Sequence, residues 1–113
     1  MKHIFGNFTQ HQIIEQKKIL HSMIFWLLLY KDPKTSYKFK YVDFDKYFNS
    51  LMSRISGFGE LIFNPPEIVS LLSILEGAYL ETQKDFFDFL IYRKLILDAH
   101  SLVDKIKEVD SND

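Results

Sequence analysis

The chain contains no cysteine, only three prolines and four glycines, and no long hydrophobic run. Without cysteine, disulfide bonds and thiolate metal sites are excluded. The longest uninterrupted apolar run covers residues 23–30, whereas a membrane-spanning helix needs about 20 apolar residues. The N-terminal sequence MKHIFGNFTQHQ lacks the apolar region and the small-residue cleavage site of a signal peptide. We therefore expect a cytoplasmic protein without a membrane-spanning segment.

The composition is that of a folded chain. Hydrophobic residues make up 47% of the 113 residues and charged residues 26%, a balance that favours a packed core over disorder. A chain of this length suits one domain. We expect a single helical domain over residues 1–113, with a disordered tail at residues 108–113.

Apolar residues recur every three or four positions in four segments, and this spacing predicts four helices. The segments cover residues 10–30, 44–56, 65–81 and 86–107. From Ile19 onward the first segment is apolar on nearly all sides, so we expect this helix in the middle of the fold. Short loops favour antiparallel neighbours. The predicted fold class is all-α: a compact bundle of four main helices with short extra turns.

The ends of these helices are predicted from capping residues and helix breakers. Asp43, Asn64 and Asp85 each precede a helical segment, where an oxygen of the side chain can accept a hydrogen bond from an amide of the first turn. The Gly-Phe-Gly sequence at 57–59 is expected to end the second helix. The connection before Asp43 contains the alternating sequence YKFKY, but a single strand would have no partner. We expect it to be an extended loop.

Two helix faces stand apart from the main apolar stripes. Phe86, Leu90 and Leu97 form a second apolar stripe on the N-terminal half of the fourth helix. The small residues Ser70, Ser73 and Gly77 share one face of the third helix. Small side chains let another element approach closely, so this face can pack against a helix of the bundle or receive a partner protein.

Few residues suggest chemistry. His100 and Asp104 are spaced for a two-ligand metal corner, although a surface histidine beside a carboxylate is the favoured interpretation. Asp85 and Asp88, with Glu81 nearby, could serve acid–base catalysis, but a solvated helix start is favoured here too. The sequence contains neither a G-x-S-x-G elbow nor a phosphate-binding glycine loop. We expect no catalytic, cofactor-binding or metal site, and no enzyme activity.

Charge is distributed unevenly along the chain. Residues 1–54 contain nine basic and four acidic side chains, whereas residues 55–113 contain five basic and eleven acidic ones. The loop at 31–41 interleaves four lysines with aromatic residues, as binding sites for single-stranded nucleic acid do. A helical nucleic-acid-binding or regulatory module that uses this loop is therefore an alternative function. The acidic second half argues against it, because it would repel phosphates.

The chain resembles the small immunity proteins of bacterial contact-dependent growth inhibition systems, the CdiI type. The resemblance is carried by FNPPEIVSLLSILEGAYLE at 63–81 and YRKLILDAHSLVDKI at 92–106. IFGNF at 4–8 and VDFDKYFNSLMSRISGFGELI at 42–62 are similar too. Most of these motifs are core patterns of leucine, isoleucine and aromatic residues. The similarity includes all-helical members that oppose ribonuclease toxins, among them toxins of ribonuclease A-like fold.

This resemblance implies a cytoplasmic protein that binds the C-terminal toxin domain of its own delivery system and covers the active site or the substrate groove. The expected partner is one cognate toxin domain, a basic nuclease, in a one-to-one complex without a membrane and without direct contact to nucleic acid. Acidic side chains could then mimic RNA phosphates and speed the encounter. We predict that the toxin-facing surface includes four acidic residues: Glu76, Glu81, Asp85 and Asp88.

Overall fold

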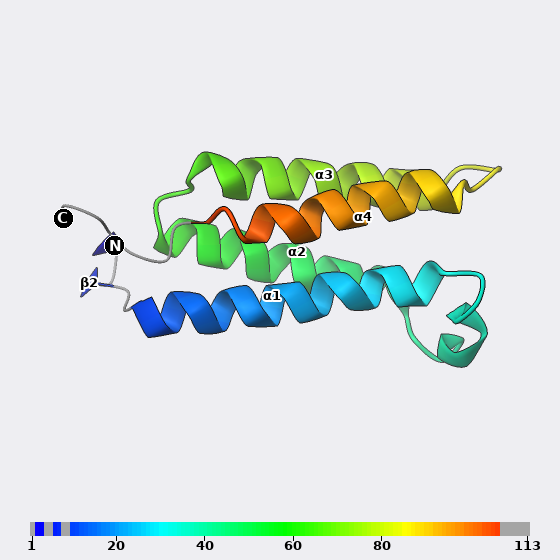
Figure 1. Ribbon diagram of the computed structural model, residues 1–113, viewed down its shortest axis with the longest axis horizontal. Helices are drawn as coiled ribbons and strands as arrows, with labels where there is room; N and C mark the ends of the chain where they lie inside the picture. Colours follow the sequence, from blue (N-terminus) through cyan, green and yellow to red (C-terminus); the bar gives the residue numbers. More distant parts are fainter. Residues whose placement is uncertain (1, 4–5, 8–9, 107–113) are drawn as a thin grey trace.

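The computed structural model describes residues 2–3, 6–7 and 10–106 and consists mainly of four helices (Figure 1). They are α1 (Gln10–Lys31), α2 (Phe44–Leu61), α3 (Pro66–Thr82) and α4 (Phe89–Val103). A short 3₁₀ helix, η1 (Ser36–Phe39), lies between α1 and α2. Near the N-terminus, β1 (Lys2–His3) pairs with β2 (Gly6–Asn7) in an antiparallel ladder. The tail at 108–113, for which disorder is predicted, lies outside the described residues.

The four helices run alternately up and down along the long axis of the molecule, and each packs against two others (Figure 1). α4 contacts α1 and α3, while α2 contacts the same two helices from the other side. Each helix turns an apolar stripe inward. The core is formed by buried residues of all four helices: Leu20, Ile24, Leu27, Leu51, Ile55, Leu71, Leu75, Ile96 and Ala99. The predicted all-α four-helix bundle is confirmed.

The prediction that α1 lies in the middle of the fold is wrong. Phe25 and Trp26 on its outer side are 48% and 39% exposed. The bundle of the described residues has no central helix, because each helix packs mainly against two neighbours and keeps an outer face. The apolar residues on the outer side of α1 therefore belong partly to the surface.

The second helix does not end at the Gly-Phe-Gly sequence but continues to Leu61. Gly59 is buried where the start of α3 crosses the end of α2: a β-carbon there would lie 2.6 Å from Ile68 Cγ2 and 2.8 Å from Asn64 Oδ1. The glycine therefore serves close packing within a helix. The chain reverses its direction at Phe63 and Asn64, shortly after the end of the helix. These two residues adopt positive φ angles of 64° and 48°. The Asn64 amide donates to the Gly59 carbonyl at 2.7 Å and closes this turn.

Alanine substitutions at the two glycines of α2 should have opposite effects. Gly59→Ala forces Ile68 to move and is expected to lower the free energy of unfolding by about 1–3 kcal/mol. Gly57→Ala meets no heavy atom within 4 Å, so it should raise the free energy of unfolding by about 0.5–1 kcal/mol through helix propensity. Urea unfolding of both variants measures the difference. Equal effects at the two positions would contradict the packing role of Gly59.

The predicted caps are confirmed at one helix and wrong at two. The Asp43 carboxylate accepts a hydrogen bond from the Lys46 amide at the start of α2. α3 has Pro65 rather than Asn64 at its N-cap, because Asn64 is used in the left-handed turn. α4 is capped by Asp88 rather than by Asp85, and it ends at Val103, before the predicted end at residue 107.

The connection between α1 and α2 is not an extended loop, as predicted, but contains the 3₁₀ helix η1. The Phe39 ring at the end of η1 packs edge-on against Trp26 and Tyr30 of α1, at centroid distances of 5.6 and 5.2 Å. Tyr30 also contacts the Tyr47 ring of α2 at 5.1 Å. These aromatic contacts fold the connection back onto the bundle.

Candidate functional site

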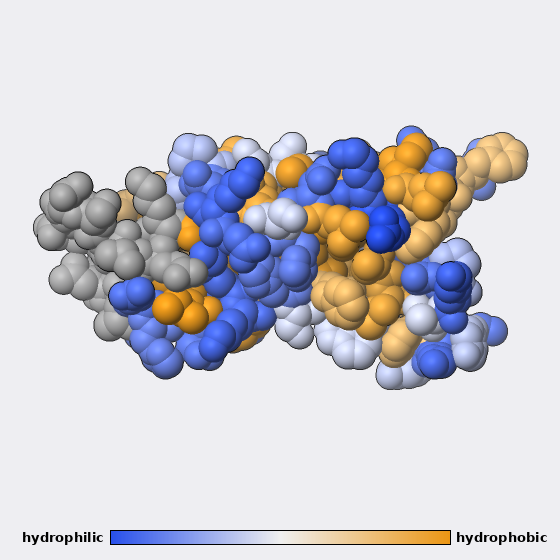
Figure 2. Space-filling model, viewed as in Figure 1, coloured by the Kyte–Doolittle hydropathy of each residue, from blue (hydrophilic) through white to orange (hydrophobic). Residues whose placement is uncertain are grey.

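The segment that joins the end of α3 to the start of α4 carries several strongly exposed apolar side chains. We call residues 80–91 the hairpin tip. Phe86 is 92% exposed and Leu90 is 74% exposed, and Leu80 and Ile91 are exposed as well. The tip lies at one end of the long axis, where Figure 2 shows an apolar surface. Single exposed apolar residues are common on protein surfaces, whereas several exposed large apolar side chains in one segment make the hairpin tip a candidate interaction site.

The second apolar stripe of the fourth segment therefore does not join the core. Phe86 precedes α4, and Leu90 and Leu97 lie on its outer side. The stripe at Tyr92, Ile96, Ala99 and Val103 faces the bundle instead. Hydrophobic spacing predicts that a helix has an apolar face, but it does not distinguish a face that packs internally from one that stays open.

The hairpin tip is held in shape by the buried side chain of Glu81, which is only 4% exposed. Its carboxylate accepts a hydrogen bond from Lys84 Nζ at 2.9 Å and one from the Asp88 backbone N–H at 3.1 Å. These two donors hold the pKa of the Glu81 carboxyl below its ordinary value. The carboxylate thus ties both sides of the loop to the end of α3. Phe86 lies between the two tied positions and is presented outward.

The four acidic residues predicted to face a partner take different positions. Glu76, Asp85 and Asp88 are exposed, whereas Glu81 is buried. Glu76 lies one helical turn before Leu80, on the same side of α3. The Asp88 carboxylate accepts hydrogen bonds from the backbone amides of Leu90 and Ile91, at 2.9 and 3.4 Å. Asp88 is nevertheless exposed to solvent. The three exposed carboxylates accompany the apolar residues of the tip, and Glu81 supports the loop from inside.

The small-residue face of α3 is divided. Ser70 and Ser73 are exposed. Gly77 is half-buried, and a β-carbon there would approach Leu95 Cδ1 of α4 to 3.9 Å. Only the end of this face packs against the neighbouring helix.

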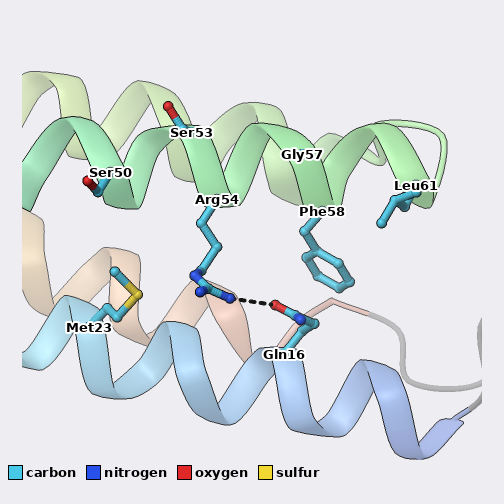
Figure 3. A pocket seen from close by; sticks show the side chains of 8 residues that line it. All are labelled: Gln16, Met23, Ser50, Ser53, Arg54, Gly57, Phe58 and Leu61. Carbon is cyan, nitrogen blue, oxygen red and sulfur yellow. Dashed lines mark hydrogen bonds between the residues drawn. The ribbon is translucent and has the colours of Figure 1, made fainter.

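A second candidate site is the groove of about 470 Å³ between α1 and α2 (Figure 3). Met23 and Phe58 supply apolar walls, and Arg54 reaches from α2 to Gln16 of α1 with a 3.5 Å hydrogen bond. The described residues that line the groove include serines but neither a histidine nor a carboxylate. This lining offers hydroxyl groups and one positive charge, without a neighbouring base to activate a hydroxyl.

Comparisons with models of protein families, with curated proteins and with solved structures give no match. Among residues 2–3, 6–7 and 10–106, no three histidine, aspartate or glutamate side chains are grouped so that they could hold a metal ion. Within the same residues, no helix is both long enough and apolar enough to cross a membrane.

The histidine predicted as half of a metal corner is part of a contact between α1 and α4. The rings of His21 and His100 stack with centroids 4.3 Å apart. His21 Nε2 lies 3.1 Å from both the Asp104 carboxylate and the His100 carbonyl oxygen. Because both neighbours are acceptors, Nε2 carries the proton. Asp104 therefore interacts with a histidine from another helix.

Acidification should weaken this contact. Burial and the neighbouring His21 lower the pKa of His100, whereas Asp104 raises it. The net result is a pKa below the ordinary value of 6.5. The unfolded chain then binds more protons, so the free energy of unfolding falls as the pH drops below about 6.5 towards the folded pKa. Lys17 and Lys105 also lie near this end of α4. Urea unfolding at about pH 7.5 and about pH 5.5 measures this effect. Between these two pH values, the free energy of unfolding should fall less in the His100→Gln variant than in the parent chain. An equal fall in both proteins would show that His100 does not cause the pH dependence.

Proposed function

We propose that this protein is an immunity protein that binds and neutralises the C-terminal toxin domain of a contact-dependent growth inhibition system. The toxin is expected to be a basic ribonuclease, held in a one-to-one complex in the cytoplasm. The hairpin tip covers the toxin's active site or RNA groove. An inhibitor of this kind acts by occupying a surface and needs no catalytic group of its own.

The observation that carries this proposal is the pairing of exposed apolar and acidic side chains on a braced loop. Phe86 resembles the aromatic anchors of protein interfaces, which insert into pockets of the partner, and Leu90 adds exposed apolar surface to the same tip. Residues 76–91 contain four acidic residues and one lysine, which suits a basic partner. The buried Glu81 carboxylate fixes the loop before binding, so less conformational entropy is lost in the complex.

Growth rescue tests the proposed function. The chain is co-expressed with the toxin domain encoded immediately upstream of it, and survival is compared with that of cells expressing the toxin domain alone. We expect full growth, and a one-to-one complex when the two chains are purified together. Cell death despite folded protein would overturn the proposal.

Charge reversal of the exposed acids should slow formation of the complex. In the double variant Glu76→Lys and Asp85→Lys, which keeps the Asp88 cap of α4, steering towards a basic toxin is reduced, so the association rate should fall by about fivefold or more at low salt. Surface plasmon resonance measures the rate, and circular dichroism checks the helix content.

A matched control reverses two exposed acids away from the tip: Glu15→Lys and Glu60→Lys. It changes the net charge equally and should reduce the association rate much less. Equal reductions in both variants would assign the effect to net charge alone and remove the hairpin tip from the interface.

A further inference from the structure

The η1 connection forms a second site, which the toxin-binding role does not use. A solvent-open cavity of about 350 Å³ lies between η1 and the adjoining ends of α1 and α2. The aromatic residues Tyr30, Tyr37, Phe39 and Phe44 line it. Lys31, Lys40 and Ser36 line it as well. The cavity thus combines flat apolar surfaces with two cations.

The walls of this cavity are fixed by packing. Phe39 and Tyr30 meet edge to face at 5.2 Å, and Trp26 supports Phe39 from behind at 5.6 Å. Lys31 Nζ lies 4.2 Å from the centroid of the Phe44 ring, which holds this ammonium group at the cavity by a cation–π contact. Tyr37 is 61% exposed. Lys38 Nζ lies over its ring, 5.8 Å from the centroid, so a base that stacks on this ring uses the opposite face or displaces Lys38.

The charge of the cavity favours an anion. The described residues that line it include lysines but no carboxylate. Asp32 and Asp43, the nearest acids in the sequence, are not among the lining residues, and their carboxylates accept backbone hydrogen bonds from Lys34 at 2.9 Å and Lys46 at 3.1 Å. Among the described lining residues, an anionic group in the cavity would meet Lys31 and Lys40 but no carboxylate.

The size and surroundings of the cavity favour a small ligand over a long single strand of nucleic acid. Its volume is near the lower limit for small-molecule sites, about 300–1,000 Å³. The acidic hairpin tip lies at the same end of the bundle (Figure 1) and would repel the phosphates of a strand that extends beyond the cavity. These features distinguish the site from the sequence-based alternative of a nucleic-acid-binding loop.

We propose that this cavity binds a free nucleoside monophosphate. The base stacks on the exposed tyrosine ring, and the phosphate is bound by Lys31 and Lys40 with the Ser36 hydroxyl as a further donor. Stacking on aromatic rings and charge-assisted hydrogen bonds to phosphate are the two interactions that such a ligand requires.

Isothermal titration calorimetry of the full chain with AMP tests this proposal. Adenosine, which lacks the phosphate, and inorganic phosphate, which lacks the base, are the reference ligands. AMP should bind at least about tenfold more tightly than either, since it uses both interactions. Lys31→Gln and Lys40→Gln should each weaken AMP binding by about tenfold.

Lys34→Gln is the matched control, because Lys34 belongs to the same connection but does not line the cavity. It should leave AMP affinity nearly unchanged. The proposal is overturned if AMP binds no more tightly than inorganic phosphate, or if all three lysine variants weaken it equally. Tighter binding of a short single-stranded RNA than of AMP would also overturn it and would favour a polymer site.

Discussion

Replacing Phe86 by alanine is expected to weaken the complex with the toxin domain by about 30-fold or more, which corresponds to about 2 kcal/mol. The Phe86 ring is 92% exposed in the free protein, so its removal costs little packing. The free energy of unfolding should therefore change by less than about 0.5 kcal/mol. Calorimetric titration of the toxin domain and urea unfolding of the variant separate the two effects.

Phe63→Ala is the control for this experiment. Phe63 is also exposed, at 59%, but it lies in the turn between α2 and α3, at the opposite end of the bundle (Figure 1). It should leave toxin affinity unchanged. Equal affinities of the Phe86→Ala variant and the parent chain would remove Phe86 from the interface, whatever the result of growth rescue.

Replacing Lys17 by methionine is expected to lower the free energy of unfolding by about 2–3 kcal/mol. Lys17 is buried, and its ammonium group donates to the carbonyl oxygens of Asp104 and Ile106 at 3.2 and 2.9 Å. These carbonyls follow the end of α4, where helix geometry leaves acceptors without intrahelical donors. Methionine retains most of the side-chain volume but leaves the acceptors unsatisfied.

The neighbouring residue supplies the control. The Lys18 side chain is 70% exposed and lies 3.8 Å from the Glu15 carboxylate. Lys18→Met removes the same charge one position along α1 and should change the free energy of unfolding by less than about 0.5 kcal/mol. Urea unfolding of the two variants measures the difference. If both variants lose a similar free energy of unfolding, the hydrogen bonds from Lys17 to the end of α4 do not stabilise the fold.

The helices could be predicted from the sequence because their signals are local. Apolar spacing in α2 and α4 depends only on residues three or four positions apart, and Asp43 caps the helix that it precedes. The continuation of α2 past Gly59 could not be predicted in this way. It depends on the close approach of Ile68, which only the folded chain brings there.

The acidic character of residues 76–88 is visible in the sequence, but the buried position of Glu81 is not. That position arises from loop geometry, which brings Lys84 and the Asp88 amide to one carboxylate. The consecutive phenylalanines in the polar stretch TQKDFFD were a local signal for the exposed anchor. A helical interpretation of the segment assigned Phe86 to an apolar stripe instead.

Hydrogen exchange of the free chain and of its complex with the toxin domain tests the central claim most directly, since it locates the interface without a substitution. We predict increased protection of backbone amides within residues 80–91, with little change at the α1–α2 groove lined by Gln16, Arg54 and Phe58. Protection confined to that groove, with unchanged exchange at the hairpin tip, would contradict the assignment of the tip as the toxin-binding surface.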